Sequence, residues 1–374
     1  MDFEKKYIPI NKGHFCLDTE IRTKEFHKKL SIGWEDEYNL YRRLWIDLPK
    51  KHEIRNYPLL LDLELSTVCN LNCPMCYTTT DSFKKKVNRQ FMDMNLFKKV
   101  VDEIAGKVFA LRLSLRGEAT LHPKFIDAIS YAKTKGIKEI SCLTNGSKLH
   151  IDFFKKAAEA GIDWITISID GLFEDYNMIR RPLKFEETLK KLRDIKKYKE
   201  TNKRLKPVIK VQSVWPAIRK NPTDYYNTIA PLVDLVSYNP LIDYLSNDIQ
   251  ILHINGLSEL KKNVEIVYEK NFVCPQLYQR IVVGSDGSVL MCSNDEDGEN
   301  IIGNAYQQSI YEIWHGDELN AIRAIHKKSD GFKDIPVCNI CYYPRKTIVD
   351  ETTLVGGRRI FIENYVNRKQ ALGD

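Results

Sequence analysis

The sequence lacks every segment that would direct the chain into or across a membrane. Its N-terminal stretch, MDFEKKYIPINKGHF, has neither a basic region followed by an apolar run nor a small-residue cleavage site. No apolar run anywhere is long enough to span a bilayer, and no internal repeat or low-complexity segment is apparent. A soluble, cytoplasmic protein is therefore expected. Its 374 residues, 43% of them hydrophobic, suffice for one large core and a smaller satellite.

The excess of basic residues is modest, at a formal net charge of +7, and much of it lies between Lys190 and Lys210. Leu189, Leu192 and Ile195 recur there at helical spacing while the lysines fall on other faces, which is typical of a helix packed on one side. Neither interleaved aromatic residues nor a groove-reading motif accompanies this stretch, so we do not expect nucleic-acid binding.

Isolated cysteines are scarce, since seven of the nine fall into two groups and only Cys16 and Cys142 stand apart. In a reducing compartment cysteines rarely form disulfides, so their spacing points first to metal ligation or catalysis. The first group is Cys69, Cys73 and Cys76, and the second is Cys274, Cys292, Cys338 and Cys341.

From about residue 58, short β-rich runs alternate with amphipathic helical stretches, a pattern typical of βα units around a parallel sheet. We expect strands at Leu59–Leu65, Phe109–Leu115, Glu139–Leu143, Trp164–Ile169, Val208–Ser213 and Leu235–Tyr238, and helices at Leu96–Ala105, Pro123–Lys135, Phe153–Ala160, Phe185–Lys199 and Thr223–Ala230. Six strands are too few for a full eightfold barrel. The expected fold is α/β, a partial (βα)6 TIM-like barrel with a small C-terminal domain.

The chain divides into five segments on this interpretation. Residues 1–57 are a helical cap or lead-in, 58–245 the barrel and 246–271 a linker. Residues 272–345 form a second, cysteine-bearing domain, which opens on the hairpin-like run RIVVGSDGSVLMC with its Asp286-Gly287 turn signal. Residues 346–374 are a C-terminal tail with enough apolar residues to be ordered.

The first cysteine group has three members within eight residues, directly after an expected strand in LELSTVCNLNCPMC. Three thiolates on one loop can each hold one iron of a cubane cluster. No fourth cysteine is near, because the next one is Cys142, so one iron would stay open to an exogenous ligand. The alternatives are a structural zinc site, which normally has four ligands, and three buried cysteines that act as small apolar residues.

At this point the sequence resembles the radical S-adenosylmethionine (SAM) superfamily, whose C-x3-C-x-Φ-C loop is matched by Cys69, Cys73, Met75 and Cys76. The resemblance covers roughly residues 58–245. It implies a 4Fe-4S cluster on the three cysteines with SAM bound to the open iron. It also implies reductive cleavage of SAM to a 5′-deoxyadenosyl radical, which abstracts hydrogen from a substrate, and a reducing partner such as flavodoxin or ferredoxin.

The same resemblance implies SAM contacts at the carboxyl ends of the strands. LRGEATLHP corresponds to a Gly-Gly-Glu-Pro-like segment that holds the methionyl amino group through Gly117 and Glu118, although Arg116 replaces the first Gly and Ala119 the Pro. The other implied contacts are Ser168 and Asp170 on the ribose, Arg180 on the carboxylate, the turn residues Thr144 and Asn145, and Met75. Three of them also have an ordinary structural interpretation: a helix N-terminal acid for Glu118, a surface arginine for Arg180 and a tight turn for Asn-Gly.

The second group supplies four thiolates, the full set for one further 4Fe-4S cluster. Its spacing, together with the segment between Cys292 and Cys338, resembles the SPASM/twitch domains that carry auxiliary clusters in radical SAM enzymes. A complete SPASM domain has three more cysteines beyond Cys341, and none follows here. One auxiliary cluster, saturated by protein and suited to electron transfer, is therefore expected. A zinc ribbon and a purely structural cluster are the alternatives.

The leading functional hypothesis is dehydrogenation of a small-molecule alcohol, such as a sugar, aminocyclitol or nucleotide-linked sugar, with the auxiliary cluster as electron acceptor. An epimerase is the main rival, with Cys142 as the thiol that returns hydrogen. A peptide-modifying enzyme is a further alternative, although residues 1–57 look too short for a peptide-recognition domain. A hypothesis of another class is a non-catalytic iron–sulfur protein for redox sensing or nucleic-acid binding.

Overall fold

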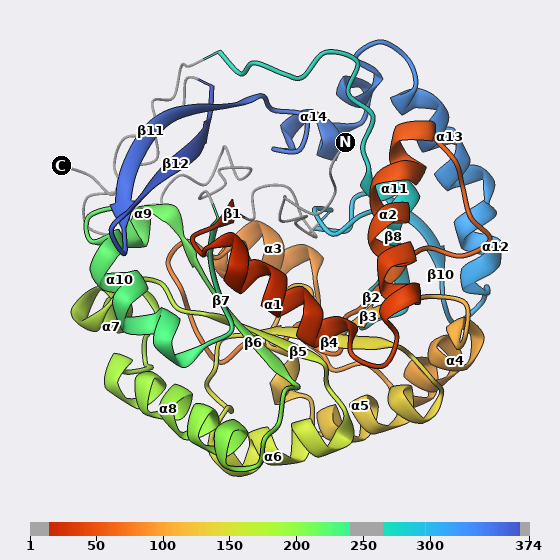
Figure 1. Ribbon diagram of the computed structural model, residues 1–374. Coiled ribbons are helices and arrows are strands. Elements are labelled where there is room, and N and C mark those ends of the chain that lie inside the picture. The colour runs from red at the N-terminus through yellow and green to blue at the C-terminus, as the bar shows by residue number, and fades with distance from the viewer. Residues whose placement is uncertain (1–14, 240–264, 296, 367–374) are drawn as a thin grey trace.

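The computed structural model describes residues 15–239, 265–295 and 297–366, which form one curved sheet surrounded by helices (Figure 1). The ten strands of this sheet follow the order β1-β7-β6-β5-β4-β3-β2-β8-β9-β10. The six expected barrel strands are confirmed as β2 Leu60–Leu63, β3 Ala110–Arg112, β4 Glu139–Thr144, β5 Trp164–Ser168, β6 Val208–Val214 and β7 Leu235–Asn239. All six are parallel, as a partial barrel requires.

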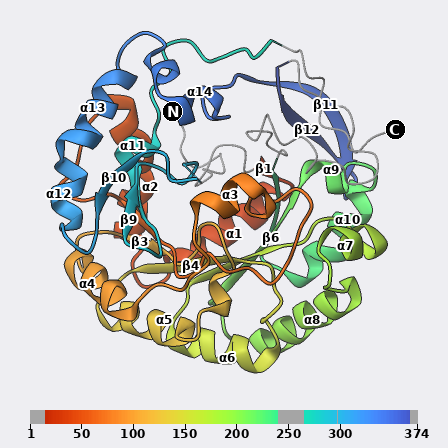
Figure 2. The ribbon, with the colours of Figure 1, turned by 180° about the vertical axis from the view of Figure 1, so that it is seen from behind.

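The crossover helices cover the outer face of this sheet, where Figures 1 and 2 show them as a ring. They are α4 Met94–Ile104, α5 Phe125–Thr134, α6 Ile151–Ala160, α7 Phe173–Ile179, α8 Phe185–Thr201 and α10 Pro222–Ile229. Helix α4 is representative: Asp93 caps its N-terminus by accepting from Asn95 N, and Leu96, Val100 and Ile104 are buried at helical spacing. The five expected helices are thus confirmed within a few residues at each end.

Two N-terminal helices, α1 Glu20–Ser31 and α2 Glu35–Lys51, lie on the inner side of the sheet (Figure 1). The Phe26 ring of α1 lies 5.5 Å from the ring of Trp164 at the start of β5. Lys29 pairs with Asp234 at 2.6 Å, just before β7. Helix α1 therefore packs against the amino ends of the strands and leaves their carboxyl ends for a site. The short strand β1, Phe15–Cys16, adds an antiparallel edge to β7.

The C-terminal part begins with the expected hairpin, β8 Arg280–Val283 and β9 Ser288–Leu290, which the structure confirms. Strand β8 also pairs in parallel with β2, so this segment continues the barrel sheet. Sequence periodicity does not reveal that pairing, because the two strands lie more than 200 residues apart. Strand β10, Ile301–Asn304, completes the edge. The predicted boundary between barrel and linker at residues 245 and 246 lies outside the described residues.

The remaining elements are short, apart from α13 and a final hairpin. They are α3 Asp81–Lys86, α9 Trp215–Ile218, α11 Gln276–Gln279, α12 Ile310–His315, α13 Asp317–His326, α14 Pro336–Ile340, and the 3-10 helices Tyr77–Thr79, Ala119–Leu121, Ala230–Leu232 and Gly331–Asp334. The final hairpin, β11 Thr347–Val355 with β12 Arg358–Tyr365, packs on α10, where the Thr223 hydroxyl donates to Leu354 O at 2.6 Å. Among the described residues, no helix is both long and apolar enough to cross a membrane.

Candidate active site

The first cysteine group lies on the loop that follows β2, at the carboxyl end of the sheet. Cys76 N donates to Cys73 O at 3.0 Å, which curls the loop. Cys73 is buried, while Cys69 and Cys76 are half-buried. Burial raises the pKa of the Cys73 thiol to about 11, although the nearby Arg180 guanidinium opposes the shift. The three thiols thus lie on one curled loop, and two of them are partly accessible.

Gly117 holds the strand-end segment after β3 directly against the cysteine loop. A Cβ atom at this position would lie 2.5 Å from Ser66 O and from the carbonyl carbon of Thr67. Glu118 N also donates to Val68 O at 2.8 Å. The Gly-Glu pair expected to bind SAM is therefore joined by backbone contact to the residues that precede Cys69.

We expect Gly117→Ala to displace the cysteine loop and to lower iron content after anaerobic reconstitution, because the added methyl group meets backbone atoms that have little room to move. Gly106→Ala is the matched control. At Gly106 no atom lies within 4 Å of the added methyl, so only the backbone strain of φ 70°, roughly 1–2 kcal/mol, remains. Normal iron content and melting temperature in Gly117→Ala would contradict this role.

The Glu118 carboxylate links the segment after β3 to the carboxyl end of β4. It accepts hydrogen bonds from the Thr144 hydroxyl at 2.7 Å, from Asn145 N at 2.6 Å and from the Thr120 hydroxyl at 2.5 Å. Burial raises the pKa of Glu118 despite these donors. Asn145 in turn directs its Nδ2 toward Cys69 Sγ at 3.8 Å. Glu118 therefore orients the Thr-Asn turn beside the first cysteine.

Asp170 and Arg180 form the other side of the same region. Arg180 Nε donates to Asp170 Oδ2 at 2.6 Å, and Asp170 Oδ1 accepts from Val214 N at 2.7 Å and Ser213 Oγ at 3.1 Å. Arg180 Nη1 lies 3.6 Å from Cys73 Sγ. Ser168, at the end of β5, is buried, and its hydroxyl makes no hydrogen bond within the described part of the chain. The guanidinium thus connects the predicted ribose-binding carboxylate to the cysteine loop.

The structure brings the predicted SAM residues to one end of the sheet, with Met75 half-buried between Cys73 and Cys76. Cys142 is separate from them. It pairs with Ile165 in the sheet, whereas its neighbour Ser141 pairs with Trp164, which contacts α1 on the inner side. Because side chains alternate along a strand, Cys142 faces the outer helices. Burial, then the Glu118 charge, raise the pKa of its thiol.

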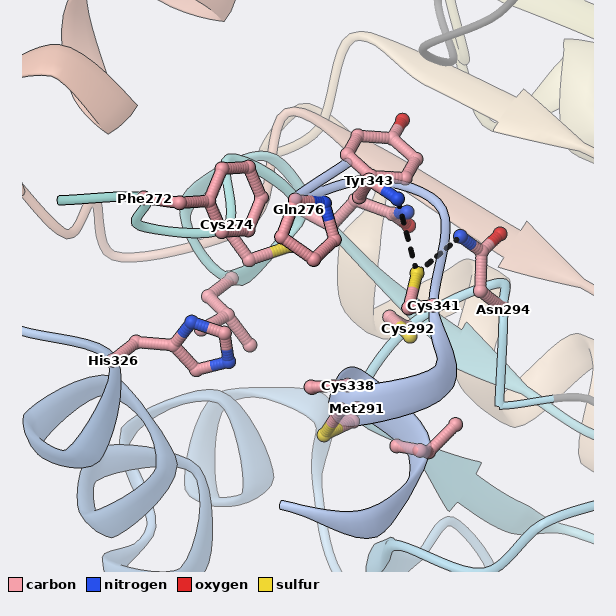
Figure 3. Close-up of a pocket in the computed structure, with 13 residues that line it drawn as sticks. Phe272, Cys274, Gln276, Met291, Cys292, Asn294, His326, Cys338, Cys341 and Tyr343 are labelled. Atoms are coloured by element: carbon pink, nitrogen blue, oxygen red, sulfur yellow. Dashed lines mark hydrogen bonds between the residues drawn. The ribbon is translucent and has the colours of Figure 1, made fainter. Parts of the chain in front are cut away.

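The four cysteines of the second group line a single buried cavity (Figure 3). Cys274 precedes α11, Cys292 follows β9, and Cys338 and Cys341 come from α14 and its C-terminal cap. Cys341 Sγ accepts from Asn294 Nδ2 and from Tyr343 N, both at 3.4 Å. N–H groups directed at cysteine sulfur are the donors that adjust iron–sulfur sites. Burial raises the pKa of Cys274 to about 12, with the nearby Cys341 adding to the shift, although backbone N–H groups of Gln276 and Leu277 oppose it.

His326 lines the same cavity and supports occupancy by a polar group. It is 1% exposed, and neither ring nitrogen has a hydrogen-bond partner among the described residues. Burial lowers its pKa to about 4, so the ring is neutral and carries one N–H. Buried polar groups are normally paired, and the sulfides of a cluster would provide an acceptor. The unpaired His326 ring and the four thiols are the observations that point to a polar, thiolate-ligated group in this cavity.

Three residues of these sites were not expected from the sequence. Asn294 lies two residues after Cys292, a position that could have drawn attention, whereas nothing in the sequence marks His326. Arg116 replaces a glycine of the SAM motif. It binds Glu64 through Nε at 2.7 Å and Nη2 at 2.5 Å, and Glu64 also accepts from Ser285 N at 3.1 Å. Glu64, held by Arg116, thus joins the barrel to the hairpin that begins the C-terminal part.

Comparison with known families agrees with both cysteine sites. The model of the radical SAM superfamily matches residues 63–209, and the model of the SPASM iron–sulfur cluster-binding domain matches residues 274–342. This chain contains a radical SAM domain and a C-terminal SPASM domain. Its cofactors are SAM and a 4Fe-4S cluster, which the first domain implies, and the additional iron–sulfur binding that the second implies. The radical SAM domain supports the enzymatic alternative over the non-catalytic one.

Several curated proteins share part of this sequence. The tungsten-containing aldehyde ferredoxin oxidoreductase cofactor-modifying protein of Pyrococcus furiosus is 32% identical over 41% of this chain and 43% of its own length. The 7,8-dihydro-6-hydroxymethylpterin dimethyltransferase of Methanocaldococcus jannaschii is 27% identical over 33% of this chain and 24% of its own. The chain thus spans less than half the length of these relatives.

Solved structures share the fold at low sequence identity. BtrN in complex with AdoMet and 2-DOIA has a TM-score of 0.52 and 18% identity, over 78% of this chain and 94% of its own. SuiB of Streptococcus suis bound to S-adenosylmethionine has a TM-score of 0.51 and 15% identity, over 86% of this chain and 82% of its own. The similarity confirms the expected partial barrel with a C-terminal domain.

Proposed function

We propose that this radical SAM enzyme dehydrogenates a small-molecule alcohol and that its auxiliary cluster accepts the electron left after hydrogen abstraction. The observation that supports this function is the cavity in Figure 3, where four cysteines from three segments of the chain line one space. Four thiolates saturate a 4Fe-4S cluster, so the cluster has no open iron for substrate and is suited to electron transfer.

We assign the residues of the two sites as follows. Cys69, Cys73 and Cys76 hold the SAM cluster, and Cys274, Cys292, Cys338 and Cys341 hold the auxiliary cluster. Met75, Gly117, Glu118, Thr144, Asn145, Ser168, Asp170 and Arg180 surround SAM. Within this set Arg180, near Cys73 and paired with Asp170, is placed to meet the SAM carboxylate through its fork of N–H donors. Glu118 acts on SAM through the turn that it orients.

When bound, SAM and the cluster on Cys69, Cys73 and Cys76 would supply the abstraction of one hydrogen atom from the alcohol carbon. The oxidation is balanced when a base takes the hydroxyl proton and the auxiliary cluster takes the remaining electron, which leaves a carbonyl. The protein orients SAM and keeps water out, since the strand-end residues Glu118, Thr144 and Asp170 are all buried.

The location of Cys142 favours dehydrogenation over epimerisation. A hydrogen donor must reach the substrate radical, yet this thiol is 1% exposed and lies on the helix-covered face of β4. We further propose a cytoplasmic enzyme, reduced by flavodoxin or ferredoxin, because thiolate-ligated clusters need a reducing compartment. The test of the reaction class is a search of cell extract, with reduced enzyme and SAM, for a metabolite that loses the mass of two hydrogens.

We expect Glu118→Ala and Asp170→Ala each to weaken SAM binding by roughly tenfold. This is about 1.4 kcal/mol, comparable to the net contribution of one buried hydrogen bond. The first leaves the Thr144 hydroxyl and Asn145 N without their acceptor, and the second leaves Arg180 unpaired. Titration of SAM into each anaerobic, reconstituted variant measures its affinity for SAM. Asp152→Ala, with a side chain 77% exposed on α6, is the control. Wild-type affinity in both variants would show that these residue assignments are wrong.

A further inference from the structure

Arg280 is a fully buried cation beside the auxiliary cavity. It begins β8, its side chain is 0% exposed, and its Nε donates to Gln276 Oε1 at 2.9 Å. Its Nη2 donates to the hydroxyl of Ser293, the residue that follows Cys292. Gln276 itself lines the cavity. Gln276 and Ser293 therefore hold the guanidinium next to the residues that line the cavity on the Cys292 side.

The same guanidinium also faces the barrel. Arg280 Nη1 lies 3.4 Å from Asp62 Oδ2, and Asp62 is a fully buried residue of β2. Asp62 is shared, because Arg112 Nε lies 2.7 Å from its other oxygen. Parallel pairing of β8 with β2 produces this arrangement, since it places Leu60 opposite Arg280 and Asp62 opposite Val282. Arg280 thus lies between the barrel interior and the cysteine cavity.

The carboxylates around Arg280 leave its charge only partly balanced. Asp62 serves two guanidinium groups, and Glu64 is bound by Arg116. Asp295 is a further carboxylate near Cys292 and Cys338, and its oxygens accept from Glu299 N and Asn300 N of its own loop. A buried charge is screened far less than a surface charge. The part of the Arg280 charge that Asp62 does not balance therefore acts on the charge that the cavity holds.

We infer that Arg280 raises the reduction potential of the auxiliary cluster and so makes it a competent electron acceptor. A cluster held by four thiolates becomes more negative when it takes an electron, and a fixed cation nearby stabilises that reduced form. This inference rests on the proposed function, in which the cluster takes the electron from the substrate radical. Arg280 is a positioning and tuning residue, because its contacts are to Gln276, Ser293 and Asp62.

The test is a redox titration of the auxiliary cluster, followed by electron paramagnetic resonance, in full-length protein that carries Cys69→Ala, Cys73→Ala and Cys76→Ala. Only the auxiliary cluster then gives a signal. Adding Arg280→Gln should lower the ratio of reduced to oxidised cluster at least tenfold at a fixed potential, a shift of 59 mV or more for one electron. Arg280→Lys, which keeps the charge, should stay close to the parent. Asp62→Asn, which removes the opposing carboxylate, should shift the potential upward.

Arg323→Gln is the matched control. Arg323 is a buried arginine of the same domain, but it donates to backbone carbonyls of Leu277 and Trp314 at 3.0 and 2.8 Å. Its removal should leave the potential unchanged. An unchanged potential in Arg280→Gln, or equal shifts in the Arg280 and Arg323 variants, would overturn the inference while leaving the proposed function intact. If Arg280→Gln fails to assemble the cluster, the unchanged potential expected of Arg280→Lys and the upward shift expected of Asp62→Asn still decide. If the parent triple-cysteine variant holds no auxiliary cluster, both this inference and the proposed function are refuted.

Discussion

Replacement of Cys69, Cys73 and Cys76 together with Ala is expected to abolish SAM cleavage and to halve the iron content, from about eight to about four irons per chain. The three thiols lie on one loop after β2, whereas the other four cysteines line a cavity in the C-terminal part. Loss of one site should therefore leave the other filled. Iron and sulfide analysis after anaerobic reconstitution measures the content, and release of 5′-deoxyadenosine after dithionite reduction measures cleavage.

The design includes a control for the loss of any buried cysteine. Cys142→Ala removes a thiol that packs under the outer helices, so its iron content and SAM cleavage should match those of the wild type. A triple variant that kept all its iron, or one that still cleaved SAM, would refute the assignment of the first cluster. Zinc in place of iron at the remaining site would refute the auxiliary cluster.

Cys274→Ala and Cys338→Ala are each expected to stop product formation while 5′-deoxyadenosine is still released. Removal of one of four thiolates should destroy the auxiliary cluster or its electron-accepting role, yet neither residue contacts the loop that carries Cys69. SAM cleavage and turnover are thereby uncoupled. The measurement is the ratio of 5′-deoxyadenosine to product. This ratio should rise from about one by a factor of about ten or more, which corresponds to a loss of roughly 1.4 kcal/mol or more in the free energy of activation for product formation.

The outcome for these two variants also separates the roles of the second cluster. A purely structural cluster would, when lost, reduce SAM cleavage and turnover in parallel with the free energy of unfolding. Arg323→Gln perturbs the packing of the same domain without removing a thiolate, so it shows what structural damage alone does. Equal ratios of 5′-deoxyadenosine to product in the cysteine variants and in the wild type would contradict an electron-accepting role.

Much of the fold is predictable because the barrel strands are short apolar runs, buried on both faces, between helices with one apolar face. Residues of β5 illustrate this, since all five from Trp164 to Ser168 are buried. The pairing of β8 with β2 could not be predicted, because it joins strands that are distant in the sequence. The inner position of α1 and α2 likewise depends on contacts such as Phe26 with Trp164.

The candidate site is also predictable only in part. Cysteine spacing predicts both clusters, since thiolate ligation needs those residues in number and proximity. Single residues give no comparable signal. Glu118 stays a predicted SAM contact, and the sequence did not indicate that its carboxylate accepts from Thr120, Thr144 and Asn145. His326 and Arg280 became visible only when the structure placed their buried polar groups beside the four cysteines.

The most direct test of the proposed dehydrogenation is the isotope content of product made in D2O, once the metabolite that loses two hydrogens has been identified. The account predicts one SAM consumed per product, a product lighter by two hydrogens, and no deuterium at the reacting carbon. Cys142→Ala should remain active in this assay. A product of unchanged composition that carries one deuterium at that carbon, together with an inactive Cys142→Ala variant, would contradict the account and establish an epimerase.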